Sequence, residues 1–354
     1  MRVAQVAPLA EAVPPKLYGG TERVVSYLTE ELVSLGHDVT LFASGDSVTA
    51  AELVPILSKA LRLDQSVRDP LALTVAMIET VARRASEFDV VHFHIDHLHL
   101  PLFTWRKLPF LTTLHGRLDL PELAPTFRLF PDARFVSISN AQRRPLPFLN
   151  WAGTVHHGLP TDFPGRLSEP RGYLAFLGRI SPEKGPDRAI EIAARSGMPL
   201  KMAAKVDNAD LAYYEAEIRP MLREYAGIVE FIGEIDEQEK SDFLGGAAGL
   251  LFPVDWPEPF GLVMIEAMAC GTPVIGFDRG SVREVVDHGT TGFVVSDVAE
   301  AAAATKHLQI LDRARIRNVF ATRFTARRMA LDYLDLYESI ASATSAIGVA
   351  EAAE

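Results

Sequence analysis

Two glutamates stand out because they frame a long apolar segment. Glu258 lies just before the stretch from Phe260 to Phe277, and Glu266 lies inside it, while the other residues of the stretch are apolar or neutral. An ionised carboxylate is costly to bury unless another group pairs with it. Each glutamate must therefore face either water or a ligand.

The residues around Glu258 predict an anion site. Pro257 and Pro259 hold the chain extended, and we expect a helix to begin at Phe260-Gly261. The amides of residues 260–263 would then be free to bind a phosphate, and Glu266, two turns in, would accept hydrogen bonds from a hydroxylated group. The alternative is that both glutamates are solvated residues at a helix start, favoured by the helix dipole.

Two cations follow a predicted strand in the segment "GRISPEKGPDRAIEI". Arg179 and Lys184 lie between the strand 172–178 and a helix that begins at Pro186. In a strand-to-helix loop of an α/β fold, such cations can neutralise a pyrophosphate without a metal. Solvated loop charges are the alternative.

Two candidates lie in the first half of the chain. Gly19 and Gly20 precede a helix, where paired glycines let a ligand approach the backbone or simply form a turn. His115 follows the apolar strand 109–114 and is a candidate to bind a substrate hydroxyl, or a loop histidine without a role.

Four clustered histidines, His92, His94, His97 and His99, invite a metal interpretation. No carboxylate pattern or second cluster supports it, and no Asp-x-Asp pair is present to hold Mg²⁺. We therefore expect no metal and place these histidines on the wall of a ligand cleft or its acceptor side.

Composition excludes several classes of function. The net charge of −11 over 354 residues disfavours a nucleic-acid partner, and no polybasic helix supports membrane contact. The single cysteine, Cys270, fits a small packing residue in a reducing, cytoplasmic setting. We expect a monomer or homodimer.

The periodicity predicts two doubly wound α/β domains with a cleft between them, where ligands of such folds bind. Strands at 2–7, 38–43, 89–94, 109–114 and 134–139 are followed by a second series at 172–178, 199–205, 227–233, 249–254 and 272–277. The predicted parts are residues 1–165, 166–324, a helix at 325–342 that crosses back to the first domain, and a frayed tail at 343–354.

These motifs together resemble the family-4 retaining glycosyltransferases of the GT-B fold. The matching segments are "EPFGLVMIEAMACGTPVI", "GRISPEKG", "GGTE" and "TLHG", in the family's order. The resemblance implies a nucleotide-sugar donor, UDP-glucose as a guess, an acceptor of unknown identity and no required metal. It also implies an oxocarbenium-like state on one face of the sugar, with the leaving phosphate helping to deprotonate the acceptor.

Carried over to this chain, the resemblance gives each residue a role. Arg179 and Lys184 would bind the diphosphate. Glu266 would bind the ribose hydroxyls and Glu258 the hydroxyls of the donated sugar, while His115 would contact the transferring sugar. The remaining donor contacts would come from Gly19, Gly20, Phe260, Gly261, Leu262 and Val263, with Gly233 at the base-binding edge.

Two departures from the family pattern affect this assignment of roles. "AAKVDNAD" replaces a glycine-rich turn and places Lys205 near the expected phosphate or base, and "HHGLP" replaces an asparagine-glycine turn.

The alternatives to a glycosyltransferase are a nucleotide-sugar epimerase, which would need further acid/base carboxylates, and a non-catalytic nucleotide-sugar or glycan-binding protein, which need not keep Arg179, Lys184 and His115. A dehydrogenase lacks its dinucleotide fingerprint.

Overall fold

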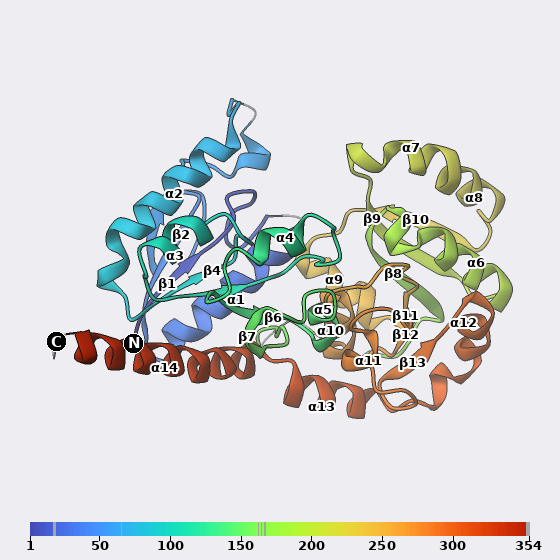
Figure 1. The fold of residues 1–354 in the computed structure, drawn as a ribbon. Coiled ribbons are helices and arrows are strands. Elements are labelled where there is room, and N and C mark those ends of the chain that lie inside the picture. The colour runs from blue at the N-terminus through green and yellow to red at the C-terminus, as the bar shows by residue number, and fades with distance from the viewer. Residues whose placement is uncertain (17–18, 65, 162, 164, 166–167, 352–354) are drawn as a thin grey trace. The chain divides into compact units, whose positions relative to one another are not determined.

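The structure, a computed structural model, describes residues 1–16, 19–64, 66–161, 163, 165 and 168–351, with side chains as far as residue 342. The chain divides into two compact units (Figure 1), which are described separately. The first unit combines Met1–Pro160 with Ala326–Glu354, and the second is Thr161–Thr325. Residue 166, where the second predicted domain starts, lies outside the described residues.

The first unit, over its described residues, is built on a seven-stranded parallel sheet in the order β3-β2-β1-β4-β5-β6-β7. Its strands are β1 (Arg2–Val6), β2 (Asp38–Ala43), β3 (Glu52–Pro55), β4 (Val90–Phe93), β5 (Phe110–Thr113), β6 (Arg134–Ser137) and β7 (Asn150–Thr154). Its helices are α1 (Gly20–Ser34), α2 (Pro70–Arg84), α3 (Leu100–Trp105), α4 (Leu123–Phe127), α5 (Asn140–Arg143) and α14 (Ala326–Glu351).

The second unit repeats the pattern with a parallel sheet whose six described strands follow the order β10-β9-β8-β11-β12-β13. The strands are β8 (Tyr173–Arg179), β9 (Leu200–Lys205), β10 (Val229–Gly233), β11 (Ala247–Phe252), β12 (Val274–Phe277) and β13 (Gly292–Val295). The helices are α6 (Pro186–Ser196), α7 (Leu211–Tyr213), α8 (Arg219–Glu224), α9 (Glu237–Gly245), α10 (Leu262–Ala269), α11 (Val282–Val285), α12 (Val298–Ala304) and α13 (Arg313–Arg323).

Local sequence signals fix several helix ends. Asp69 caps α2 ahead of Pro70, whose missing N–H costs nothing in a first turn. Asp236 and Glu239 form a capping box on α9. α6 ends at Ser196 and is followed by Gly197, whose φ of +71° is the left-handed conformation that commonly stops a helix.

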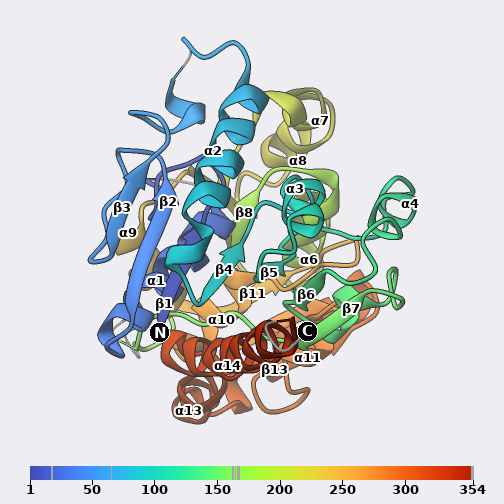
Figure 2. The ribbon, with the colours of Figure 1, turned by 60° about the vertical axis from the view of Figure 1, so that its left-hand side comes forward.

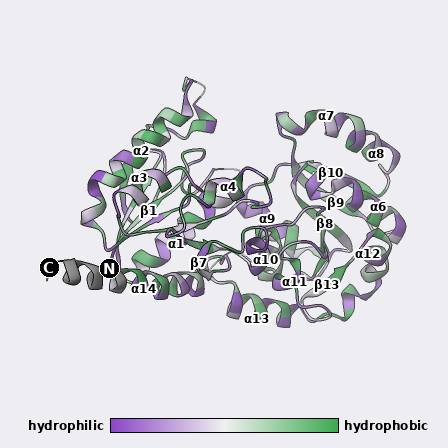
Figure 3. Ribbon diagram, viewed as in Figure 1, coloured by the Kyte–Doolittle hydropathy of each residue, from purple (hydrophilic) through white to green (hydrophobic). Residues whose placement is uncertain are grey.

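Each sheet forms the centre of its own hydrophobic core. The strands of the first unit bury residues such as Val91 and Phe93, and those of the second bury Leu174 and Leu251. Helices on both sides carry polar as well as apolar segments (Figure 3), as expected when a parallel sheet is covered on both faces. The predicted fold class, two doubly wound parallel-sheet units, is confirmed.

The strand order reverses once in each unit, between β1 and β4 and between β8 and β11. Ligands of doubly wound sheets bind outside the carboxyl ends of the strands at such a reversal. The loops that follow these strands are therefore the expected ligand-binding loops.

The C-terminal helix is longer than the sequence indicated. Instead of a helix at 325–342 and a frayed tail, α14 continues to Glu351. It packs against α1 and β4 of the first unit (Figure 2). The helix has no proline after residue 325 to end it, and its Ala-rich end allows it to propagate.

Candidate active site

Several predicted residues follow the carboxyl ends of neighbouring strands in the second unit. β8 ends at Arg179 and β9 at Lys205, and these two residues are paired in register. β10 ends at Gly233, which has φ of +90°. Glu258 lies in the loop that leads from β11 to α10. Because all four strands are parallel, the structure gathers these residues at one edge of the sheet.

Glu258 is held by a lysine and a tryptophan. Lys184 Nζ lies 2.5 Å from Glu258 Oε2, and Trp256 Nε1 donates to the same oxygen at 2.9 Å. Lys184 Nζ also lies 4.9 Å from the centroid of the Trp256 ring, a cation–π contact. Glu258 is only 6% exposed, so these partners compensate for its burial. Trp256 was missed from the sequence, although it is the aromatic residue nearest to Glu258 on the amino-terminal side.

A glycine fixes the backbone at Glu258. Gly280 has φ of +55°, and a Cβ at this position would lie 2.2 Å from the carbonyl oxygen of Glu258 and 2.4 Å from its nitrogen. Ser281 N donates to Glu258 O at 2.9 Å, and its hydroxyl donates to Phe260 O at 2.9 Å. Only glycine combines this conformation with so close an approach.

Helix α10 begins later than predicted. Its first residue is Leu262, and Gly261 is the N-cap with φ of +79°, a conformation that an L side chain rarely adopts. The first-turn amides therefore include those of Leu262 and Val263, whereas Phe260, which is 2% exposed, precedes the helix and packs in the core. Glu266 is the fifth residue of the helix rather than two turns in.

Glu266 has a partner that the sequence did not reveal. Its Oε1 lies 3.2 Å from Lys240 Nζ in α9, and Glu266 is 4% exposed. Lys240 Nζ also lies 3.2 Å from Glu237 Oε2. The signal was present, because Lys240 is the only basic residue in the acidic segment from residue 234 to 243.

The other two cations of this edge are paired with carboxylates from the same edge. Arg179 Nε lies 3.2 Å from Asp210 and its Nη2 lies 3.8 Å from Glu183. Lys205 Nζ lies 2.8 Å from Asp207. Because Arg179 and Lys205 are both partly exposed, an anionic ligand can compete with these carboxylates for them.

In the first unit, Gly19 and Gly20 form the start of α1. Gly20 is the first residue of the helix, and Gly19 is its N-cap. A Cβ on Gly19 would lie 2.8 Å from Pro15 Cβ, so a close approach of the backbone requires glycine there. Residues 17 and 18, immediately before this pair, lie outside the described residues.

His115 follows β5 by two residues. Its Nε2 lies 2.9 Å from His94 Nδ1, and its ring stacks on His157 with centroids 5.3 Å apart. Burial lowers the pKa of His115 to about 3, so the imidazole is neutral at physiological pH. A neutral imidazole can accept one hydrogen bond and donate another.

Two family models match the chain and together cover most of it. The model of Glycosyltransferase Family 4 matches residues 18–158, and that of Glycosyl transferases group 1 matches residues 161–324. These two segments contain every residue that we predicted for the site. The chain belongs to the family-4 glycosyltransferases of the GT-B fold. It is a glycosyltransferase.

Full-length relatives support the assignment. The enzyme is 27% identical to the phosphatidyl-myo-inositol mannosyltransferase of Mycolicibacterium smegmatis, over 100% of this chain and 97% of the relative. It is 26% identical to the glycogen synthase of Mycobacterium tuberculosis, over 95% and 92% of the two chains. The crystal structure of Anabaena HepE in complex with UDP has a similar fold, with a TM-score of 0.72, 16% identity and coverage of 96% and 100%.

Three of the four clustered histidines are buried in the first unit, which corrects our expectation of a cleft wall for those three, whereas His97 is partly exposed. His92, His94 and His99 of this glycosyltransferase are at most 3% exposed. His92 and His99 bind threonine hydroxyls at 2.7 and 2.8 Å. Within the described part of the chain, no group of three His, Cys, Asp or Glu residues has the geometry of a metal site.

Cys270 is a packing residue. It is fully buried, and burial raises the pKa of its thiol to about 12, so the thiolate that a nucleophile needs does not form at neutral pH. In the segments that the structure describes, no helix has the length and apolar character needed to cross a bilayer.

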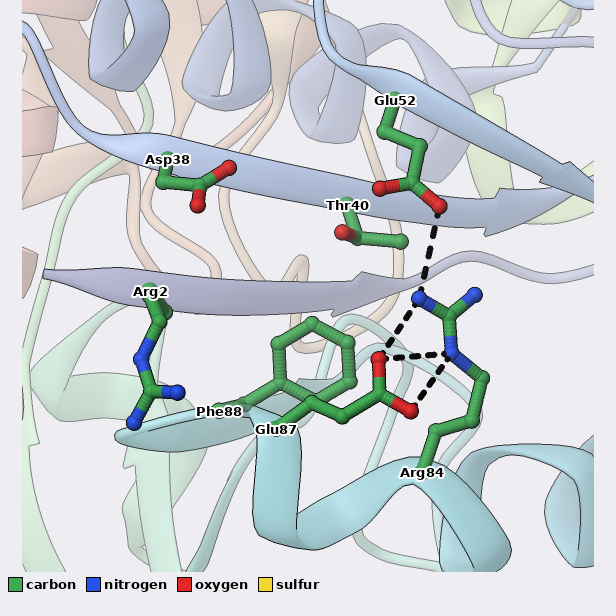
Figure 4. Close-up of a pocket in the computed structure, with 7 residues that line it drawn as sticks. All are labelled: Arg2, Asp38, Thr40, Glu52, Arg84, Glu87 and Phe88. Carbon is green, nitrogen blue, oxygen red and sulfur yellow. Dashed lines mark hydrogen bonds and ion pairs between the residues drawn. The ribbon is translucent and has the colours of Figure 1, made fainter.

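A surface pocket of the first unit lies at the opposite edge of the sheet from His115. Arg2, Asp38 and Glu52 are the first residues of β1, β2 and β3 (Figure 4). Three of the charges here pair with one another, because Arg84 Nη2 lies 2.8 Å from Glu87 and 3.3 Å from Glu52. We regard these contacts as structural ion pairs.

Proposed function

We propose that this glycosyltransferase moves a hexose from a nucleotide-diphosphate sugar to an acceptor hydroxyl, with retention of the anomeric configuration and without a metal. The observation that carries the proposal is the edge of the second sheet, where Arg179, Lys184 and Lys205 lie among strand-end loops beside Glu258. Three side-chain cations can supply the positive charge that a leaving diphosphate requires.

The donor would lie along this edge. Arg179 and Lys184 bind the diphosphate with the first-turn amides of Leu262 and Val263, while Lys205 exchanges Asp207 for a phosphate oxygen. Glu266 accepts hydrogen bonds from the ribose, Gly233 borders the base, and Gly19 and Gly20 approach the diphosphate through their backbone. A uridine nucleotide is supported by the UDP bound to Anabaena HepE.

In the transfer step, the bond between the anomeric carbon and the diphosphate oxygen breaks, and the acceptor oxygen bonds to the same face of the sugar. The acceptor proton passes to the leaving diphosphate oxygen, so atoms and charge balance. Glu258 binds sugar hydroxyls, and its contact with Lys184 couples sugar position to leaving-group stabilisation. Neutral His115 binds a hydroxyl of the transferring sugar.

The test uses donor binding and donor turnover, because neither requires the natural acceptor: in its absence water takes the hexose and the nucleoside diphosphate is released. A thermal-shift panel of UDP-, ADP- and GDP-sugars on the full-length chain identifies the donor, since a ligand of the native state raises Tm as it saturates. Lys184→Ala should then lower the rate of nucleoside diphosphate release by about 100-fold or more. Lys201→Ala, which removes a partly exposed lysine of β9 that pairs with Glu230 of β10, is the matched control.

Wild-type turnover in Lys184→Ala would overturn the leaving-group role. Activity should also persist in EDTA, and its loss with rescue by a divalent cation would refute metal independence. Analysis of the first-formed product by NMR decides between retention and inversion.

A further inference from the structure

One face of the first sheet carries a row of polar side chains. Gln5 on β1 is paired in register with His92 on β4, which is paired with Leu111 on β5. Because side chains alternate along a strand, Gln5 and His92 share a face with Thr113. The same alternation places His94 and His115, just beyond the ends of β4 and β5, on this face as well. Tyr333 and Tyr337, one turn apart on α14, meet this row.

These side chains form a continuous chain of hydrogen bonds. His115 Nε2 lies 2.9 Å from His94 Nδ1, and His94 Nε2 lies 2.8 Å from Gln5 Oε1. Gln5 Nε2 then donates to the Tyr337 hydroxyl at 3.0 Å. The remaining contacts are Tyr337 to His92 at 2.7 Å, His92 to Thr113 at 2.7 Å and Thr113 to Tyr333 at 2.9 Å.

Gln5 gives the chain a direction. Its carbonyl oxygen can only accept, so His94 Nε2 must donate to it and carries the proton. His94 Nδ1 of a neutral ring is then an acceptor, and His115 Nε2 must be the donor to it. Rotating the Gln5 amide by 180° would exchange donor and acceptor in both of these hydrogen bonds, so Gln5 sets the direction of the Gln5–His94 and His94–His115 contacts.

This polarity defines the free nitrogen of His115. With the proton on Nε2, Nδ1 carries a lone pair, and this atom is buried without a hydrogen-bond partner among the described residues. A buried polar atom without a partner is costly, and a ligand hydroxyl that donates to it removes that cost.

We propose that Gln5 and His94 are positioning residues that hold His115 as its Nε2–H tautomer, so that Nδ1 accepts a hydrogen bond from a hydroxyl of the transferring sugar. Tyr337 fixes the orientation of Gln5, which makes the C-terminal helix part of the arrangement. The sugar contact rests on the proposed function, whereas the tautomer is a property of the protein alone.

The first experiment measures the tautomer without any ligand. The full-length chain is labelled with ¹⁵N-histidine, and long-range ¹⁵N–¹H correlation spectra separate protonated from unprotonated ring nitrogens. The His115 signals are assigned by their loss in His115→Gln. We expect the proton of His115 on Nε2, with Tyr337→Phe giving a mixture of tautomers. A proton on Nδ1 in the wild type would overturn the proposal.

The second experiment measures turnover with the donor found above. Gln5→Leu and His94→Leu should lower kcat by about tenfold or more, because an imidazole in the wrong tautomer is a poor catalyst, while KM for the donor changes less. His94→Asn should recover much of kcat, because Asn Oδ1 can replace Nδ1 as acceptor. His99→Gln, at another buried histidine, is the control for disturbance of the core.

Equal kcat for His94→Asn and His94→Leu, or losses no larger than in His99→Gln, would overturn the positioning role. The thermal melting of each variant is measured alongside, and the spectra of the wild type decide the tautomer even if a leucine variant does not fold. If no donor is turned over by the wild type, the proposed function fails while the tautomer is still tested.

Discussion

At the scale of single residues, the buried charges of this glycosyltransferase are held by partners distant in sequence. Glu258 is paired with Lys184, and Glu266 with Lys240. The apolar flanks predicted that each glutamate would face water or a ligand, whereas in the structure each is paired with a lysine. Which group it would be, including Trp256 and Lys240, could not be predicted, because these contacts join residues brought together only by the folded sheet.

The Glu266–Lys240 pair makes a testable contribution to stability. Lys240→Met leaves the Glu266 carboxylate buried without its partner, which should lower the free energy of unfolding by about 2 kcal/mol or more. Urea denaturation measures the loss. The double variant Lys240→Met/Glu266→Gln removes the charge as well and should regain part of it.

Equal stability of the single and double variants would show that the lysine does not compensate the glutamate. Calorimetry with the donor separates this effect from ligand binding. Glu266→Gln alone should weaken donor binding if the ribose contact is made, and an unchanged dissociation constant would count against that contact.

At the scale of elements, the apolar runs were sufficient to place ten of the described strands but not β3, β7 and β13. β3, "ELVP", has no fully buried residue, β13, "GFVV", begins with a glycine, and β7, "NWAGT", is half-exposed with a glycine in its middle. Such strands form because a neighbouring strand offers hydrogen bonds, and this is tertiary context rather than local propensity. The start of α10 was likewise misplaced because it depends on the left-handed conformation of Gly261.

Glycines that let two loops touch should be more sensitive than glycines that only turn a chain. Gly280→Ala must move the backbone of Glu258 in addition to straining φ, whereas Gly197→Ala strains φ alone, because a Cβ there meets nothing within 4 Å. We expect Gly197→Ala to cost about 1 kcal/mol of stability with little change in kcat.

Gly280→Ala should cost more than Gly197→Ala and should also lower kcat, because Glu258 and Lys184 are displaced together. Denaturation curves and donor turnover of the two variants give the comparison. Similar stability and similar turnover in both would mean that the loop around Glu258 adapts without consequence.

At the scale of the whole molecule, the two ends of the chain meet in one network. Gln5, in the first strand, donates to Tyr337, in the last helix. The two units have similar sheets, but only the first includes the C-terminal helix. The sequence predicted this helix and His115 separately, and it held no signal that a chain of hydrogen bonds joins them, because the register of three strands decides which polar side chains align.

The buried histidines also make stability depend on pH. Burial lowers the pKa of each below the ordinary value of 6.5; the group comprises His92, His94, His99, His115 and His157. Below pH 6.5 the unfolded chain therefore binds more protons than the folded one, so stability is complete above pH 6.5 and is lost as the pH falls. Each histidine adds to this slope, by at most the roughly 1 kcal/mol per pH unit that one proton bound only in the unfolded chain is worth.

Urea titrations between pH 5 and 8 should accordingly show a steep loss of the free energy of unfolding on the acid side. Removing one of the five by His99→Gln should reduce the slope below pH 6 by up to roughly 1 kcal/mol per pH unit. The slope of the control variant Lys201→Ala should match that of the wild type. If His99→Gln also kept the wild-type slope, His99 would titrate alike in the folded and unfolded chains, and its burial beside Phe93 would have no electrostatic consequence.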